Sequence, residues 1–126
     1  MTRSTERATI LAVDDSNTVR KMIESVLRSQ HYAVVTAADG LEALESLERS
    51  PCDLVVLDIN MPRMDGLSLL KAIRERAEWS KLPVLMLTTE GQESDRDTAL
   101  AMGATDYLTK PFKPAQLLER VAAWLG

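Results

Sequence analysis

The chain has a single cysteine, Cys52, among its 126 residues. One thiol cannot form an internal disulfide, and it cannot supply the several sulfur ligands of a thiolate metal site. The sequence also lacks an apolar run long enough to cross a membrane, and it does not begin with the charged and then apolar segment of a signal peptide. We therefore expect a cytoplasmic protein that does not insert into membranes.

Basic residues are fewer than acidic ones. The 15 Lys and Arg residues and the 19 Asp and Glu residues give a formal net charge of -4 and a pI near 5.0. A nucleic-acid surface needs clustered positive charge, so we expect no nucleic-acid partner. What remains is the composition of one globular domain, 45% hydrophobic and 27% charged, which we expect to be a monomer.

Short aliphatic runs alternate with longer segments of helical period along the chain. The expected strands are residues 9–13, 33–37, 54–58, 83–87 and 106–109. The first helix is the clearest, because apolar residues recur at helical spacing from Val19 to Leu27. Ser16 or Asn17 can cap its start, and Asp39 can cap the second helix. The helix between the last two strands has the least apolar support, so we expect it to be the loosest.

This alternation predicts parallel βαβ units and an α/β fold. We predict the flavodoxin-like, doubly wound (βα)5 architecture, a three-layer sandwich around a five-stranded parallel sheet with strand order 2-1-3-4-5. Residues 1–8 are mostly polar and predict a frayed tail, while residues 9–126 form the domain. In such a sheet, ligands bind outside the carboxyl ends of strands 1 and 3, where the winding reverses.

Three aspartates lie at the ends of these two strands. Asp14 and Asp15 come directly after the first strand, and Asp58 ends the third. Like charges that lie close together raise one another's pKa or recruit a cation. An N-cap role explains at most one of the three acids. Because Mg2+ is commonly held by one or two carboxylates together with phosphate oxygens, the pattern predicts a Mg2+ site.

Two further side chains are expected at the same edge of the sheet. The fourth strand finishes at Thr88, whose hydroxyl can bind an oxyanion, and the fifth ends with Lys110. Either residue alone is typical of a solvated surface, but beside three acids they indicate phosphoryl ligands. Pro111 follows Lys110 and restricts its backbone to extended conformations, which fixes where the lysine points.

Four segments carry a resemblance to a known family: "VDDS", "LVVLDINMPRMDGL", "VLMLTTE" and "GATDYLTKPF". Together they resemble the signature segments of response-regulator receiver domains, over residues 9–125. The resemblance is closest to the stand-alone, chemotaxis-type (CheY-like) members, because nothing follows the fifth helix. A receiver cut from a longer DNA-binding regulator would have the same residues and stays an alternative.

The resemblance implies a role for each acid of the site. Asp58 resembles the phosphoacceptor. Asp14 and Asp15, together with Asp58 and the backbone carbonyl of Asn60, resemble the ligands of Mg2+, for which Mn2+ can substitute. Asn60 and Glu90 resemble the two residues that influence how fast water removes the phosphoryl group.

Other residues would bind the phosphoryl group and respond to it. Thr88 and Lys110 resemble the hydroxyl and the lysine that contact the phosphoryl group, and Tyr107 resembles the aromatic switch residue. The resemblance also implies that the peptide bond before Pro111 is cis.

The implied function is that of a single-domain response regulator in a two-component phosphorelay, in chemotaxis or motility signalling. Asp58 would accept a phosphoryl group from a histidine kinase. The face formed by the fourth helix, the fifth strand and the fifth helix would then change and bind a target such as a flagellar motor switch protein or a kinase. His31, the only histidine, is expected far from the acids, so the phosphohistidine must come from the partner.

We expect no enzyme activity on external substrates, only self-directed phosphotransfer and autodephosphorylation. A phosphate-sink receiver would have the same residues and stays open. An aspartyl-nucleophile phosphatase would need a second acid two residues after Asp58, where this chain has Asn60. A flavin carrier of the same fold would need a hydroxyl-rich phosphate loop, where Asp14 and Asp15 would repel a flavin phosphate.

Overall fold

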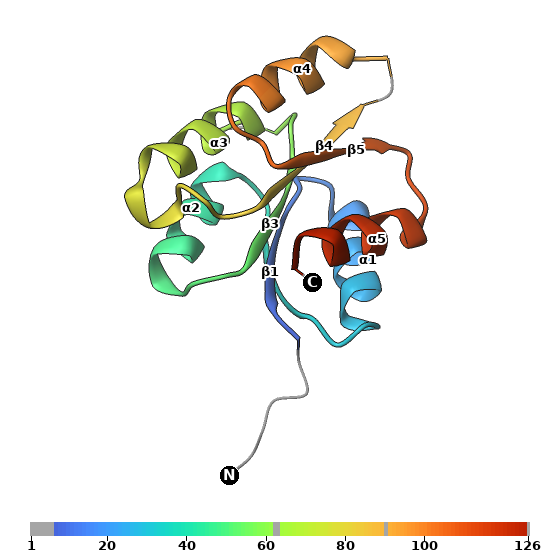
Figure 1. Ribbon diagram of the computed structural model, residues 1–126. Coiled ribbons are helices and arrows are strands. Elements are labelled where there is room, and N and C mark those ends of the chain that lie inside the picture. Colours follow the sequence, from blue (N-terminus) through green and yellow to red (C-terminus); the bar gives the residue numbers. More distant parts are fainter. Residues whose placement is uncertain (1–6, 62–63, 90, 126) are drawn as a thin grey trace.

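The computed structural model describes residues 7–61, 64–89 and 91–125. Within them, five strands form one parallel sheet in the predicted order, β2-β1-β3-β4-β5 (Figure 1). The strands are β1 (Thr9–Val13), β2 (Ala33–Ala37), β3 (Leu54–Asp58), β4 (Val84–Thr89) and β5 (Asp106–Lys110). Since β4 runs to Thr89, Thr88 lies inside that strand rather than at its end.

Helices cover both faces of the sheet. They are α1 (Asn17–Arg28), α2 (Gly40–Arg49), α3 (Gly66–Glu75), α4 (Glu93–Ala101) and α5 (Pro114–Leu125), with a 3-10 helix η1 (Ala77–Trp79) before β4. Figure 1 shows α1 and α5 on one face and α2, α3 and α4 on the other. The core is divided in the same way: Leu27 and Leu117 belong to one apolar cluster, and Ala43, Leu70 and Ala99 to the other. The three-layer sandwich is therefore confirmed.

The central strand β3 is buried along its whole length, "LVVLD". Strands that are covered on both faces are apolar at every position instead of alternating, which explains the continuous aliphatic runs of the sequence. Asp58 ends this strand and is only 5% exposed. A rigid central strand thus places one carboxylate at the carboxyl edge of the sheet.

The helix starts show why the first two helices form where predicted. The side chains of Ser16 and Asp39 each accept the backbone N–H three residues ahead, at 3.3 and 2.9 Å, so both predicted caps are confirmed. By contrast, the N-cap of α4, Gln92, makes no side-chain cap bond, and Ala99 is the one residue of α4 that is buried. The structure thus gives this helix little buried apolar surface, as its sequence indicated, and its being the loosest helix stays a prediction.

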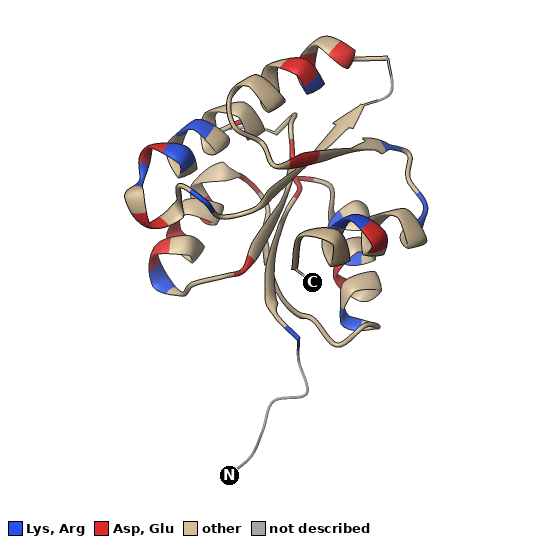
Figure 2. Cartoon of the chain, viewed as in Figure 1, with Lys and Arg blue, Asp and Glu red and all other residues tan. Residues whose placement is uncertain are grey.

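The chain enters the sheet beside its edge strand. The Arg7 N–H donates to the His31 carbonyl, and the Ala33 N–H donates to the Ala8 carbonyl, both at 2.8 Å. These two residues of the predicted tail are therefore hydrogen-bonded to β2 and to the turn before it, while residues 1–6 lie outside the described part. Basic and acidic residues are interspersed along the helices (Figure 2). Within the described residues, no helix has the length and apolar character needed to span a membrane.

Candidate functional site

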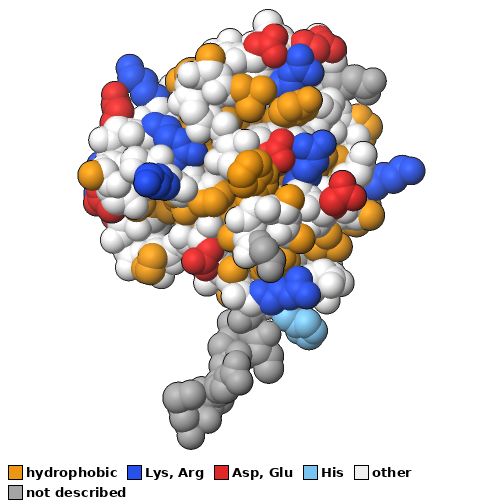
Figure 3. Space-filling view, viewed as in Figure 1, with side chains coloured by type: hydrophobic (Ala, Val, Ile, Leu, Met, Phe, Trp, Pro, Cys, Tyr) orange, Lys and Arg blue, Asp and Glu red, His pale blue; other side chains and the backbone are white. Residues whose placement is uncertain are grey.

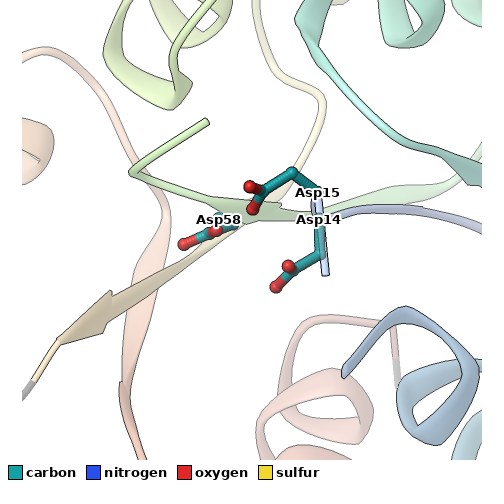
Figure 4. Close-up of side chains that lie close together, drawn as sticks. All are labelled: Asp14, Asp15 and Asp58. Atoms are coloured by element: carbon teal, nitrogen blue, oxygen red, sulfur yellow. The ribbon is translucent and has the colours of Figure 1, made fainter. Parts of the chain in front are cut away.

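The three predicted acids come together at the carboxyl ends of β1 and β3 (Figure 4). One carboxylate oxygen of each lies within 4.8 Å of the others. The β1–β3 register pairs Val13 with Leu57, so that Asp14 comes level with Asp58 in the neighbouring strand. Asp14 is fully buried, whereas Asp15 is exposed. The site is thus open to solvent on the side of Asp15.

Lys110 reaches this cluster from the edge strand β5. Its ammonium lies 3.0 Å from Asp14 Oδ2 and 3.3 Å from Asp58 Oδ1, as the sequence predicted for a lysine at this edge. Asp14 also accepts the Ser16 N–H through Oδ1, at 2.9 Å. Three carboxylates and one ammonium leave a formal charge of about -2 in the crevice when all four groups are ionised.

These contacts shift the protonation of both partners. Burial and then the Asp14 charge raise the pKa of Asp58 from 3.8 to about 6, although Lys110 and the Asn60 N–H act in the opposite direction. Burial alone would lower the pKa of Lys110, but its hydrogen bond to Asp14 and the charge of Asp58 outweigh that effect and raise it. The lysine therefore stays charged at neutral pH, and Asp58 is ionised at neutral pH against the effect of burial.

The donor set fits a hard divalent cation. All three side chains offer carboxylate oxygens, which Mg2+ prefers, and the negative charge that Lys110 leaves uncompensated favours a cation. Asn60 follows two residues after Asp58, and its N–H donates to Asp58 Oδ1 at 3.4 Å. Its role as a backbone-carbonyl ligand stays a prediction. Glu90, the other residue expected to tune hydrolysis, lies outside the described residues.

Thr88 lies one strand away from Asp58, in β4. The β3–β4 register pairs Asp58 with Leu87, which puts Thr88 one residue beyond the partner of Asp58. Its side chain is buried, 2% exposed, and its hydroxyl lies 3.4 Å from the hydroxyl of Thr109 in β5. The Lys110–Pro111 peptide bond is cis, the form that the resemblance implies.

Tyr107 lies in β5 with its side chain half-buried, and cations approach its ring from two helices. The guanidinium carbon of Arg96 in α4 lies 5.2 Å from the ring centre, and that of Arg120 in α5 lies 5.9 Å from it. Arg120 is fixed in turn by an ion pair with Asp106, at 2.9 Å. The predicted switch residue thus lies between α4 and α5, at the output face that the resemblance implies.

Sequence reasoning missed some residues that shape the site. The Arg20 guanidinium donates to the Asp14 carbonyl at 2.6 Å and so holds the segment after β1 against α1. Gly66 donates its N–H to the Ile59 carbonyl at 2.9 Å and brings the start of α3 against the chain that leaves Asp58. A glycine at the start of a helical pattern, a few residues after a strand, signals such an approach, but nothing in the sequence distinguishes Arg20 from other surface arginines.

An apolar hollow of about 400 Å3 adjoins the site on the side of α1. Its lining residues are Val19, Met22, Thr89, Lys110, Pro111 and Phe112. A larger hollow of about 1000 Å3 lies at the opposite ends of the strands, beside Pro51 and Leu82. Only the first of the two touches the residues of the acidic crevice, through Lys110.

Fold and site together define a doubly wound α/β domain with an acidic crevice, occupied by three carboxylates and the Lys110 ammonium, at its switch point. Residues 10–122 match the response regulator receiver domain, and the chain belongs to that family. Chemotaxis protein CheY1 of Helicobacter pylori is 39% identical over 119 residues, which cover 93% of this chain and 96% of that protein. The crystal structure of chemotaxis protein CheY4 of Vibrio cholerae is similar with a TM-score of 0.88 at 41% identity, covering 93% of this chain and 98% of that one.

Other relatives are longer proteins. The probable transcriptional regulator ycf27 of Guillardia theta is 43% identical over 116 residues, which cover 92% of this chain but 44% of that protein. The chain thus spans about half the length of such transcriptional regulators. The similarity is to their receiver part.

Proposed function

We propose that the chain is the phosphoacceptor of a two-component system, and that Asp58 takes a phosphoryl group from a phosphohistidine of a histidine kinase. The observation that supports this most is the placement of the Asp58 carboxylate within 4.8 Å of two other carboxylates and 3.3 Å from Lys110, in a chain of the receiver family. A lone surface carboxylate would have no means of compensating the charge of an incoming phosphoryl group.

The transfer uses Asp58 as the nucleophile. A carboxylate oxygen bonds to phosphorus while the bond from phosphorus to the histidine nitrogen breaks, and the imidazole leaves with that electron pair. Asp58 must be ionised, which its pKa of about 6 allows at neutral pH. Lys110, already paired with Asp14 and Asp58, places a positive charge beside the phosphoryl oxygens. The Thr88 hydroxyl then donates a hydrogen bond to them.

Asp14, Asp15, Asp58 and the Asn60 carbonyl would hold a Mg2+ ion, and Mn2+ could substitute for it. When bound, the ion neutralises charge on the phosphoryl oxygens. The activity on this reading is limited to self-directed phosphotransfer and to autodephosphorylation by water, with Asn60 and Glu90 influencing its rate. External phosphate esters would not be substrates.

The apolar hollow beside Lys110 suits the phosphodonor domain of the kinase. It lies between α1 and the segment after β5, next to the crevice, and Val19, Met22 and Phe112 contribute apolar side chains to it. An apolar side chain of the donor that enters this hollow would bring a phosphohistidine close to Asp58. The position of the hollow is the support for this assignment.

Output would occur at the face formed by α4, β5 and α5. Figure 3 is drawn from the side that shows these elements, and apolar side chains lie there between charged ones. Leu100 of α4 and Trp124 of α5 are exposed by 40% and 47%. When Thr88 turns toward the phosphoryl group, Tyr107 would turn inward and change this face, so that a target protein binds.

We further propose a role in chemotaxis or motility, with a flagellar motor switch protein or a kinase as target. The support is the alignment with CheY1, which covers nearly the whole of both chains. The second candidate is the receiver part of a transcriptional regulator, which the 43% identity to ycf27 favours. A phosphate sink would need no target at all.

A phosphorylation assay tests the proposal. Acetyl phosphate should label the wild-type protein in the presence of Mg2+ and fail to do so in excess EDTA. Asp58→Asn keeps the shape of the side chain but removes the nucleophile, and it should abolish labelling. Asp53→Asn is the matched control, because Asp53 lies just before the other end of β3 and its side chain accepts the Thr9 N–H, which an Asn oxygen can also accept. Labelling that persists in Asp58→Asn would refute the assignment.

Capture of a target by the protein with bound beryllofluoride, a phosphoryl mimic, would then separate the chemotaxis role from the transcriptional and phosphate-sink roles.

A further inference from the structure

Two threonines lie side by side on neighbouring strands next to the site. The β4–β5 register pairs Thr88 with Thr109, and their hydroxyl oxygens are 3.4 Å apart. The Thr88 side chain is 2% exposed, and a buried hydroxyl needs a hydrogen-bond partner. Among the described residues, the structure gives the Thr88 hydroxyl one such partner, the hydroxyl of Thr109.

Thr109 and Asp58 lie on opposite sides of Thr88 in the sheet. β4 lies between β3, which ends in Asp58, and β5, which contains Thr109. A threonine side chain occupies discrete rotamers, so a rotation that brings Oγ1 toward Asp58 takes it away from Thr109. At 3.4 Å the bond is already long for two hydroxyls, so a rotation of the Thr88 side chain away from Thr109 would break it. The two contacts of Thr88 therefore exclude each other.

We infer that Thr109 is a positioning residue, which holds the Thr88 hydroxyl toward β5 while Asp58 is unmodified and so opposes its recruitment by the phosphoryl group. The inference rests on the proposed function, since it assigns a second state to the same hydroxyl. Thr88 and Thr109 also line a small polar cavity of about 60 Å3 together with Arg96, the arginine that lies over the Tyr107 ring. The exchange of partners thus takes place next to the output face.

The energetic consequence follows from linkage between the two states. A ligand shifts a two-state equilibrium by the difference between its affinities for the states, and an interaction present only in the free state lowers the apparent affinity. One weak hydroxyl–hydroxyl bond corresponds to an effect of about two- to five-fold. Its removal should therefore strengthen binding of a phosphoryl mimic by that factor.

The test is a titration of the full chain, loaded with Mg2+, with beryllofluoride. Thr109→Val keeps the shape of the side chain and removes the hydroxyl, so it should bind beryllofluoride about two- to five-fold more tightly than wild type. Thr109→Ser retains the hydroxyl and should restore wild-type affinity. In a Thr88→Val background, Thr109→Val should have no effect on affinity, because the hydroxyl that it positions is absent.

Thermal unfolding separates positioning from general packing. Thr109→Val should lower the melting temperature of the free protein, because Thr88 loses its partner, and lower it less when beryllofluoride is bound. An equal loss in both states, an unchanged or weaker affinity of Thr109→Val, or an effect that persists without the Thr88 hydroxyl would overturn the inference. If wild type itself fails to bind beryllofluoride, the proposed function is wrong; if it binds and the Thr109 variants do not differ, only this inference is wrong.

Discussion

At the scale of single residues, Asp58 is subject to opposing electrostatic effects. Burial and the Asp14 carboxylate favour its neutral form, while Lys110 and the Asn60 N–H favour the ionised form, and the net result is a pKa of about 6. A nucleophile must be ionised, so the reactive form is also the form that the folded protein tolerates less well. Function and stability therefore depend on pH in opposite directions at this position.

We predict that Asp58→Asn stabilises the metal-free protein relative to wild type by an amount that grows with pH. The folded-state pKa of about 6 lies above the reference value of 3.8, so stability is lost as pH rises through this interval and changes no further above it. The shift corresponds to at most about 3 kcal/mol. Urea unfolding in EDTA at about pH 5 and about pH 8 measures the effect; a stability difference that is the same at both pH values would count against the Asp58 environment described here.

Asp15 offers a cleaner test of the metal site than Asp14. Asp14 is fully buried and bonded to Lys110 and to the Ser16 N–H, so its substitution also breaks those contacts. Asp15 is exposed, and the structure gives its carboxylate no hydrogen bond or ion pair among the described residues.

We predict that Asp15→Asn weakens Mg2+ binding by about ten-fold or more, because one carboxylate ligand is lost. The melting temperature of the metal-free protein should stay unchanged or rise slightly, since one repelling charge is removed. Calorimetric Mg2+ titration and a thermal scan in EDTA measure the two effects, with Asp53→Asn as control. Wild-type Mg2+ affinity in Asp15→Asn would show that the cation, if bound, is held elsewhere.

At the scale of elements, α3 determines the path of the chain that leaves Asp58. A Cβ atom added to Gly66 would lie 2.3 Å from the Asp58 carbonyl oxygen and 2.6 Å from the Ile59 Cα. Both are backbone atoms, which cannot yield in the way that the end of a flexible side chain can. The contact therefore requires a glycine at the start of α3.

We predict that Gly66→Ala destabilises the protein by about 1–3 kcal/mol and slows phosphorylation of Asp58. The added methyl group must push the backbone of Asp58 or Ile59 away from α3, which also moves the nucleophile. Urea unfolding and the rate of labelling by acetyl phosphate measure both effects, and Ser68→Ala, at an exposed position of the same helix, is the control. If Gly66→Ala is as stable and as reactive as the control, the close packing of Gly66 against the Asp58 and Ile59 backbone is not needed for stability or for phosphorylation.

The helix α4 is the element with the least support. It buries a single residue, Ala99, and lacks a side-chain cap, whereas α1 has the Ser16 cap and buries Ile23 and Leu27. Elements with few buried contacts open most often. If α4 is part of the output face, as proposed above, a loosely packed helix there would suit a change of shape that costs little free energy.

We predict that the backbone amides of α4 exchange with solvent faster than those of the other four helices (α1, α2, α3 and α5). Hydrogen–deuterium exchange followed by mass spectrometry measures this directly on the unmodified protein. Protection of the α4 peptides equal to that of the α1 peptides would contradict the prediction that α4 is the loosest of the helices.

At the scale of the whole molecule, the order of strands and helices along the sequence was enough to predict the fold and the place of the acidic site, but not the contacts within that site. The aliphatic runs indicate the strands, and the carboxyl ends of parallel strands meet at one edge, so the convergence of Asp14, Asp15 and Asp58 followed without coordinates. The position of the Lys110 ammonium between Asp14 and Asp58, and the pairing of Thr88 with Thr109, depend on the register between strands and on rotamers, neither of which is encoded locally. The 3-10 helix η1 was missed as well, because three residues are too few for a periodic pattern.

The central claim is that the acidic crevice of this fold makes an acyl phosphate on one aspartate. The most direct measurement is to treat the Mg2+-loaded protein with acetyl phosphate, reduce it with borohydride, and sequence the peptides by mass spectrometry. Reduction converts a phosphorylated aspartate into homoserine and leaves free aspartates unchanged. We predict homoserine at position 58 alone, and none when Mg2+ is withheld. Homoserine at position 14 or 15, or at no position, would contradict the account.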